Sequence, residues 1–303
     1  MRRQVIRNDM LAEIPKECSK VLPPILDLSR IAQLLADKDC RVFDCSFDFA
    51  DPDTGRSQFE AGHIRGARYL HLDDDLAGKP NGVNGRHPLP DPQDFASRMR
   101  EEGLRKDQQV VAYDNSGGSL AARLWWLLRW GGHDKVVVLD ASVDDCATAG
   151  LEIDRGPTGP IAAGDFEISG VRSQDAVDCA FVLENLYSGE YLVVDARAAA
   201  RFSGETLMMD PVPGHIPSAS NRPFTENLDS EGRFKPPEDL RREFERLIGD
   251  LPPSKVIMQC GSGITACHNL LAMHHAGLAG ALLYPGSWSE WSSDPSRPVE
   301  RGI

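Results

Sequence analysis

One cysteine of the sequence stands in a loop suited to holding negative charge. Cys260 begins the stretch CGSGIT, which follows an apolar run at residues 256–258 and precedes an apolar segment with helical spacing. Small residues let successive backbone N–H groups turn inward and form a cradle for an anion, and the N-terminus of the following helix adds its dipole. Both effects favour a thiolate over a thiol, so we predict that Cys260 is nucleophilic.

Two other roles for Cys260 can be weighed from its neighbours. Most cysteines are buried small hydrophobes, but Cys260 follows a predicted parallel strand, and α/β proteins place their sites at the carboxyl ends of such strands. A cysteine phosphatase needs an arginine six residues after the nucleophile to clamp the phosphate. Ala266 occupies that position. Phosphatase chemistry is therefore excluded.

The elements around this loop occur twice in the chain. VFDCSFDF (42–49), AGHIRGARYL (61–70) and VVAYDNSGGSLAARLWWLL (110–128) are followed, in the same order, by LVVDARAAARF (192–202), PGHIPSAS (213–220) and VIMQCGSGITACHNLLAM (256–273). Asp114 stands in the first copy where Cys260 stands in the second. An aspartate is no sulfur nucleophile, so we predict that the first half is a non-catalytic copy that supports the second.

The fold class follows from how each half alternates short apolar runs with amphipathic segments. Strands buried on both faces and joined by helices indicate an α/β fold with a parallel sheet flanked by helices in each half. Residues 150–170 are rich in Gly and Pro and lack periodicity, which is typical of a linker. We predict an N-terminal domain over residues 1–155, a linker over 156–170 and a catalytic domain over 171–303.

Composition excludes several classes of protein. The 303 residues contain 33 Lys and Arg against 46 Asp and Glu, a net charge of −13, which argues against binding nucleic acid or an anionic membrane. No apolar run reaches the roughly 18 residues of a membrane span, and the N-terminus lacks the apolar core of a secretory signal. The seven cysteines form no CxxC pair. We expect free thiols, a cytoplasmic protein, and neither metal nor cofactor.

Taken together, these motifs resemble the tandem-domain sulfurtransferases of the rhodanese superfamily. The resemblance covers residues 28–302 and includes GHIRGA, GHIPSA, WWLLRWGGH, VVDAR…RF, CGSGITACHNLL and YPGSWSEWSSDPSRPV. It implies two tandem rhodanese-like domains. Thiosulfate-preferring members usually carry basic residues after the cysteine, whereas 3-mercaptopyruvate enzymes usually carry a neutral CGSGVT loop. CGSGIT matches the neutral pattern with one exchange, which implies 3-mercaptopyruvate as the small-molecule sulfur donor.

The resemblance also implies a reaction and roles for particular residues. The Cys260 thiolate attacks the donor sulfur, pyruvate leaves, and the resulting persulfide passes its outer sulfur to thioredoxin, a low-molecular-weight thiol or cyanide. Ser262 matches a loop serine that assists proton transfer, and Asp73 matches an acidic residue that completes a Cys-Ser-Asp relay. His87 matches a histidine that reaches the site from the first domain. Arg201 matches an arginine that binds the substrate carboxylate. The residues that complete the substrate-binding loop are Gly261, Gly263, Ile264 and Thr265.

Most of these residues also have a structural explanation. Asp73 begins a run of three acidic residues, and His87 lies in a Gly-rich loop, so both could be surface residues. Arg197 fits better as a support of the domain fold than as a substrate ligand. The histidines of the repeated GHI motif are expected to bind loop backbone, and the aspartates at two strand ends to anchor neighbouring loops: His63 and His215, Asp44 and Asp195.

One departure from the family leaves the donor open. Mercaptopyruvate enzymes usually carry a second arginine before GHIP, but the stretch GETLMMDPVPGHIP contains none, and Asp210 stands near that place. Losing such a partner costs on the order of 1.5–3 kcal/mol of binding. Arg86 or Arg222 could replace it. Otherwise the chain uses thiosulfate or another donor, or it is a non-turnover persulfide carrier.

Overall fold

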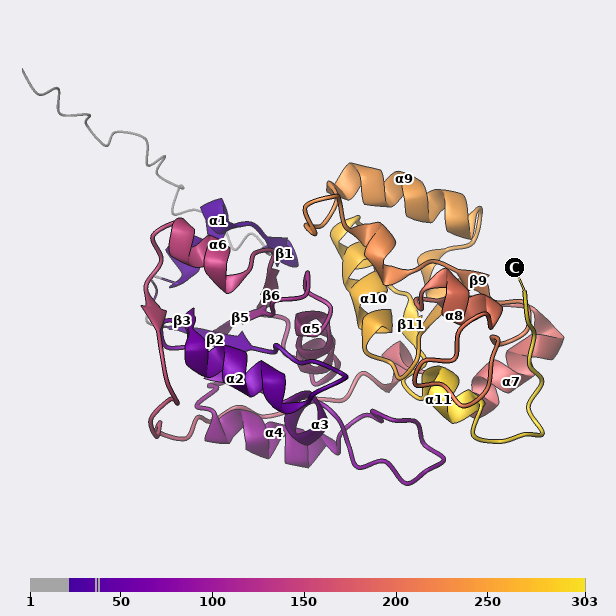
Figure 1. Cartoon of the computed structure of the whole chain (residues 1–303), viewed down its shortest axis with the longest axis horizontal. Helices are drawn as coiled ribbons and strands as arrows, with labels where there is room; N and C mark the ends of the chain where they lie inside the picture. Colours follow the sequence, from indigo (N-terminus) through magenta and orange to yellow (C-terminus); the bar gives the residue numbers. More distant parts are fainter. Residues whose placement is uncertain (1–21, 36, 38, 303) are drawn as a thin grey trace, which may run out of the picture.

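The structure, a computed structural model, describes residues 22–302 except 36 and 38, and it has two α/β domains (Figure 1). The first domain is built on a sheet of five parallel strands in the order β1-β6-β5-β2-β4. In that order the strands are β1 (Ile25–Leu26), β6 (Val136–Leu139), β5 (Gln109–Tyr113), β2 (Cys40–Asp44) and β4 (Arg68–Tyr69). The short apolar runs that the sequence shows in the first half are therefore the central strands of this sheet.

Helices and one small antiparallel pair complete the first domain. The helices are α1 (Leu28–Leu35), α2 (Asp53–Ala61), α3 (Leu72–Asp75), α4 (Pro92–Glu101), α5 (Ala121–Trp130) and α6 (Val143–Thr148). The antiparallel pair joins β3 (His63–Ile64) to β7 (Ile153–Asp154). β7 lies at the start of the Gly- and Pro-rich segment, so this pairing ties the chain leaving the domain to the GHI motif.

The second domain repeats the plan. Its parallel sheet has the order β11-β10-β8-β9, and a bridge from Ala176 to Leu283 extends it in the way β1 extends the first sheet. The strands are β8 (Leu192–Asp195), β9 (Ser220–Asn221), β10 (Val256–Gln259) and β11 (Leu282–Leu283). The helices are α7 (Cys179–Ser188), α8 (Ala199–Ser203), α9 (Pro237–Ile248), α10 (Thr265–His275) and α11 (Ser287–Trp291), with 3₁₀ turns η1 (Ser173–Asp175), η2 (Phe224–Asn227) and η3 (Pro253–Lys255).

The repeated GHI motif has the same structural role in both domains. Nδ1 of His63 bonds the carbonyl of Phe59 at 2.8 Å, and the two rings stack 3.8 Å apart. Nδ1 of His215 bonds the carbonyl of Phe202 at 2.9 Å, and those rings stack 3.7 Å apart. The prediction that these histidines bind backbone is confirmed, but the carbonyls belong to the helices α2 and α8 and not to loops. The match shows that the duplication extends to this contact.

The two domains meet along α5 and α10, which lie side by side at the centre of the molecule (Figure 1). α5 packs on its own sheet and also against α10, so every residue of α5 except Arg129 is buried. The Trp125 ring lies 5.5 Å from the ring of His274 on α10, edge to face. One apolar core therefore continues from the first domain into the second. This shared core brings loops of the first domain to Cys260.

The segment between the domains is anchored rather than loosely attached. Phe166 is buried at 1% exposure, and its N–H bonds the carbonyl of Leu104 at 3.1 Å. The N–H of Gly164 bonds the carbonyl of Arg100 at 2.8 Å. The boundaries 1–155, 156–170 and 171–303 remain a prediction.

Two features of the described residues bear on the sequence predictions. None of the helices among residues 22–302 has the length and apolar character needed to cross a membrane. The six cysteines in this range are all free thiols, and Cys18 lies outside the described residues. The prediction of free thiols is confirmed for these six.

His268 of α10 ties the domains together through a neutral ring. Its Nε2 lies 3.0 Å from the carbonyl of Gly117 in the first domain, and its Nδ1 lies 3.1 Å from the side-chain amide nitrogen of Asn227. The tautomer with the proton on Nε2 satisfies both contacts, because Nδ1 then accepts from the amide. Protonating Nδ1 would set two donors against each other. Burial lowers the pKa of His268 to about 4.

We therefore expect the protein to lose stability in mild acid. The folded-state pKa of His268 lies below its ordinary value of 6.5, so its contribution is complete above pH 6.5 and is lost as the pH falls to 4, by about 3 kcal/mol. Urea unfolding at several pH values should show this loss in the wild type and a shallower loss in His268→Gln, which keeps a donor and an acceptor without titrating. Equal pH dependence in both proteins would contradict this role.

Candidate active site

Cys260 lies where the sequence places it, directly after β10 at the carboxyl end of the second sheet. Its side chain is almost fully buried, and the N–H of Gly263 points at its sulfur from 3.2 Å. Gly263 has φ +79°, and a Cβ there would lie 2.4 Å from the carbonyl oxygen of Pro285, so only glycine fits. Ile264 is buried in the core, and Thr265 begins α10. The predicted catalytic loop, residues 260–265, thus directs a backbone donor at the Cys260 sulfur.

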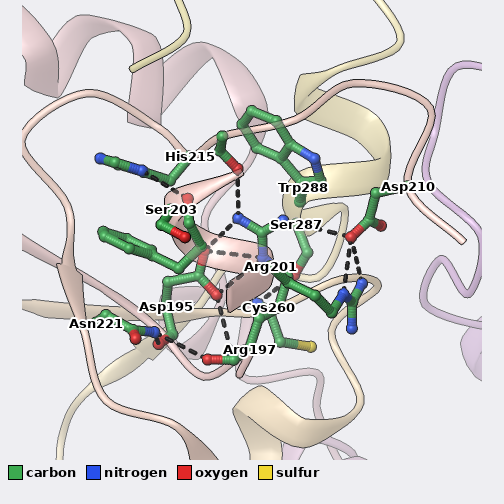
Figure 2. A network of polar contacts seen from close by, with 12 residues as sticks. Asp195, Arg197, Arg201, Ser203, Asp210, His215, Asn221, Cys260, Ser287 and Trp288 are labelled. Atoms are coloured by element: carbon green, nitrogen blue, oxygen red, sulfur yellow. Dashed lines mark hydrogen bonds and ion pairs between the residues drawn. The ribbon is translucent and has the colours of Figure 1, made fainter. Parts of the chain in front are cut away.

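A second segment, PGSWS at residues 285–289, holds the backbone of this loop in place. The hydroxyl of Ser287 accepts the N–H of Cys260 at 3.1 Å and donates to the carbonyl of Tyr284 at 2.9 Å. The N–H groups of Trp288 and Ser289 bond the carbonyls of Cys260 and Gly261 at 3.0 and 2.9 Å. Ser287 itself has φ 53°, an unfavourable value for a residue with a side chain. The PGSWS motif therefore clamps the backbone of the catalytic loop (Figure 2).

Three predicted residues form a chain of contacts that crosses the domain interface. Nδ1 of His87 lies 2.7 Å from the hydroxyl of Ser262, and Nε2 lies 3.0 Å from Oδ1 of Asp73. Ser262 belongs to the catalytic loop, whereas His87 and Asp73 come from the first domain. The structure therefore brings together the residues that the resemblance named, and the surface alternative is wrong for His87, which is 8% exposed.

The protonation state of His87 follows from its surroundings. Burial lowers the pKa of His87 to about 4; the nearby Asp73 acts against this shift, and the charges of Arg123 and Arg86 add to it. The ring is therefore neutral at pH 7, with one N–H. If that hydrogen is on Nε2 it donates to Asp73, and Nδ1 then accepts from the Ser262 hydroxyl. This arrangement allows Ser262 to take a proton while passing its own to His87.

Two guanidinium groups overhang the catalytic loop. A Cβ on Gly261 would lie 2.9 Å from Nη2 of both Arg201 and Arg86. Arg201 comes from α8 and Arg86 from the first domain, next to His87. The side chain of Arg201 turns toward Asp210 beside Cys260 (Figure 2). Of the two arginines considered as replacements for the missing one, Arg86 reaches the site.

The other candidate arginine does not reach the site. The guanidinium of Arg222 bonds Asn227 at 3.0 Å and Glu243 at 2.9 Å and lies over the ring of Phe244. Arg222 thus fixes η2 and α9, and the expectation that it could replace the missing arginine is wrong.

Arg197 has the structural role that the sequence suggested. It is buried, and its guanidinium pairs with Asp195 at the end of β8, with a closest contact of 2.7 Å. It also donates to the carbonyl of Gly214 at 2.8 Å and lies over the ring of Trp288. Figure 2 shows this pair beneath the Trp288 ring. Arg197 therefore joins the GHI motif to the clamp behind Cys260.

Sequence reasoning missed Arg123. This fully buried residue of α5 donates to the carbonyls of Gly263, His87 and Pro88 at 3.2–3.3 Å. It thereby holds the His87 segment against the catalytic loop, and it places a positive charge near Cys260. The one signal in the sequence is a charged residue in the first turn of a mainly apolar helical segment, whose other charged residue, Arg129, lies near its end.

The corresponding loop of the first domain surrounds a side-chain carboxylate, that of Asp114, with backbone N–H groups. Oδ1 of Asp114 accepts the N–H groups of Ser116 and Gly118 at 2.7 and 2.9 Å, and Oδ2 accepts those of Leu120 and Ala121 at 2.8 Å each. Four backbone donors thus converge on one carboxylate. The repeat shows that this strand–loop–helix frame binds negative charge, and that the copy in the first domain is already filled.

Comparison with known proteins agrees with this geometry. A model of the rhodanese-like domain matches residues 27–149 and again residues 179–294. The chain is 43% identical over 283 residues to a probable 3-mercaptopyruvate sulfurtransferase of Pseudomonas aeruginosa, covering 92% of this chain and 98% of that protein. It is 33% identical over 264 residues to the putative thiosulfate sulfurtransferase SseB of Mycobacterium tuberculosis, covering 86% and 90%.

A solved structure gives the same result at the level of the fold. The 3-mercaptopyruvate sulfurtransferase from Leishmania major superposes with a TM-score of 0.80 at 30% identity, covering 92% of this chain and 76% of that one. Two tandem rhodanese-like domains, each with a parallel sheet, define a protein of the sulfurtransferase class. The chain belongs to the rhodanese family, and it is a sulfurtransferase.

The filled cradle of the first domain yields a stability prediction. Asp114→Ala leaves four buried N–H groups without their charged acceptor and should lower the free energy of unfolding by roughly 3 kcal/mol or more. Denaturant unfolding measures this loss. The exposed residue Asp144 provides a matched control, because Asp144→Ala should change stability by less than about 0.5 kcal/mol. Equal effects of the two substitutions would contradict the role given to Asp114.

The neutral ring of His87 yields a pH prediction. Because the pKa of His87 lies at about 4, its protonation should not reduce kcat/KM for sulfur transfer between pH 7.5 and 5.5. His87→Asn should lower kcat/KM by about 10²-fold or more, the usual scale of lost proton transfer. Steady-state rates across this pH range test both statements. An acidic limb near pH 6.5 that disappears in His87→Asn would refute the neutral assignment.

Proposed function

We propose that the protein transfers sulfur from 3-mercaptopyruvate to a thiol through a persulfide on Cys260. The observation that carries this proposal is the position of the Cys260 sulfur, which receives the Gly263 N–H in a loop overhung by two guanidinium groups. The backbone donor stabilises an anionic sulfur, and Arg86 and Arg201 offer a site for a carboxylate. The names of the relatives from P. aeruginosa and L. major support the same donor.

In the first half-reaction, the Cys260 thiolate attacks the sulfur of 3-mercaptopyruvate. The new S–S bond forms as the carbon–sulfur bond breaks, and the electron pair of that bond leaves on carbon as the enolate of pyruvate. The donor's thiol proton passes to Ser262 as the Ser262 proton moves to His87, and it returns to the enolate carbon to give pyruvate. Asp73 keeps the His87 ring in orientation through Nε2.

In the second half-reaction, an acceptor thiolate attacks the outer sulfur of the persulfide. Cys260 leaves as a thiolate, which the Gly263 N–H stabilises again, and the acceptor carries away the sulfur. Thioredoxin or a low-molecular-weight thiol fits this role, and cyanide would leave as thiocyanate. The cycle needs no metal or cofactor, and we propose that it runs in the cytoplasm, where thiol acceptors stay reduced.

A second candidate donor is thiosulfate. The M. tuberculosis relative is named a putative thiosulfate sulfurtransferase, and Arg86 and Arg201 place positive charge beside Cys260 although the loop itself has none. A third candidate is a carrier that accepts one sulfur and passes it to a partner without sustained turnover.

One assay separates the three functions. The protein is mixed with 3-mercaptopyruvate or thiosulfate, with and without cyanide, and pyruvate and thiocyanate are measured. We expect sustained pyruvate release from 3-mercaptopyruvate with the higher kcat/KM, abolished in Cys260→Ser. Cys40→Ser should keep the turnover, because Cys40 lies on β2 of the first domain.

Other outcomes would point elsewhere. A higher kcat/KM for thiocyanate formation from thiosulfate would favour the second function. A single stoichiometric release of pyruvate without turnover would favour the third. Pyruvate release that survives Cys260→Ser would contradict the first and third functions.

A further inference from the structure

An internal carboxylate occupies the arginines that overhang the catalytic loop. Oδ1 of Asp210 lies 3.2 Å from both Nη1 and Nη2 of Arg86, and Oδ2 accepts from Nε of Arg201 at 2.9 Å and from its Nη2. Asp210 is 4% exposed, although the three residues before it, 207–209, are exposed. Figure 2 shows its carboxylate facing Arg201 next to Cys260. The carboxylate thus links the two domains above the loop.

The two arginines keep donors free for a ligand. Nε of Arg86 is buried, and no described residue accepts its hydrogen. Arg201 bonds Asp210 through Nε and Nη2, and its Nη1 lies 3.7 Å from a Cβ built on Gly261. Nη1 of Arg201 therefore remains available to a donor anion beside Cys260 while Asp210 stays in place.

The charges of the side chains beside Gly261 do not cancel. Arg86 and Arg201 carry two positive charges and Asp210 carries one negative charge. Arg197 also donates to Oδ2 of Asp210 at 3.4 Å, but it does not alter the sum because the charge of Asp195, its partner at 2.7 Å, cancels its own. His87 adds nothing while its ring is neutral. Arg86, Arg201 and Asp210 thus leave one uncompensated positive charge beside Gly261, which matches one carboxylate; the buried Arg123 adds a further positive charge near Cys260 that Asp210 does not contact.

We propose that Asp210 is a specificity-determining residue that restricts the sulfur donor to a single negative charge. Asp210 acts through Arg86 and Arg201 and does not touch the reacting sulfur, so it is a positioning residue. The proposal rests on the proposed function, because it assumes a Cys260 sulfurtransferase. It adds that donor choice lies in the segment before GHIP as well as in the CGSGIT loop.

Coulomb's law makes the effect depend on donor charge. The energy of two charges scales with their product, so Asp210 repels a dianion with twice the energy that it exerts on a monoanion at the same place. 3-Mercaptopyruvate carries one charge at neutral pH and thiosulfate carries two. Removing the Asp210 charge should therefore help both donors, and thiosulfate by the square of the factor gained by 3-mercaptopyruvate.

The test compares kcat/KM for both donors in the wild type and in Asp210→Asn, at one low ionic strength because salt screens the effect. If 3-mercaptopyruvate gains about threefold, thiosulfate should gain about ninefold, mainly through a lower KM. Asp210→Glu keeps the charge and should keep the wild-type preference. Glu205→Gln removes one charge from an exposed residue of the same segment, and it should change neither value.

A second variant, which changes the charge in the opposite direction, keeps the proposal testable if Asp210→Asn misfolds. Arg86→Gln removes one positive charge, so thiosulfate should lose the square of the factor lost by 3-mercaptopyruvate. Equal changes for the two donors in these variants, or no thiosulfate turnover in a folded Asp210→Asn that still uses 3-mercaptopyruvate, would overturn the proposal. A wild type that releases no pyruvate from 3-mercaptopyruvate would instead refute the proposed function.

Discussion

The hydrogen bond from an inward-turned backbone N–H to the side chain at the end of a central strand is the interaction on which both domains depend. In the first domain the anion is the Asp114 carboxylate, with four donors at 2.7–2.9 Å. In the second domain the Cys260 sulfur stands at the same position, with the Gly263 N–H at 3.2 Å. The frame is the same, and it holds a carboxylate in one domain and a cysteine sulfur in the other, from which we infer the different role of each loop.

The first domain nevertheless contributes directly to the site. His87 reaches Ser262, Arg86 reaches the space above Gly261, and the buried Arg123 bonds the carbonyl of Gly263. These contacts hold only because α5 and α10 pack into one continuous core. The first domain, which has Asp114 at the position of Cys260, therefore supplies a histidine and two positive charges to its partner.

The sequence predicted the features formed by contiguous residues, and it missed many contacts between residues that are distant in the chain. Cys260 and its cradle could be recognised because loop, strand and helix are contiguous, and the duplicated motifs predicted both sheets. His87 lies 175 residues from Ser262, so only the family resemblance could pair them. Arg222 was wrongly considered as a replacement for the missing arginine, because its hydrogen bond to Glu243 is a tertiary contact. Arg123 was overlooked because its four carbonyl partners lie in loops distant in sequence.

The central claim is that sulfur passes through the cradle of the second domain, on Cys260 alone. Peptide mass spectrometry of protein treated with 3-mercaptopyruvate in the absence of an acceptor tests it most directly. We predict one added sulfur atom on the peptide that contains Cys260, formed together with one equivalent of pyruvate and removed by an added thiol. An added sulfur on another cysteine, or pyruvate released without any sulfur on Cys260, would contradict the claim.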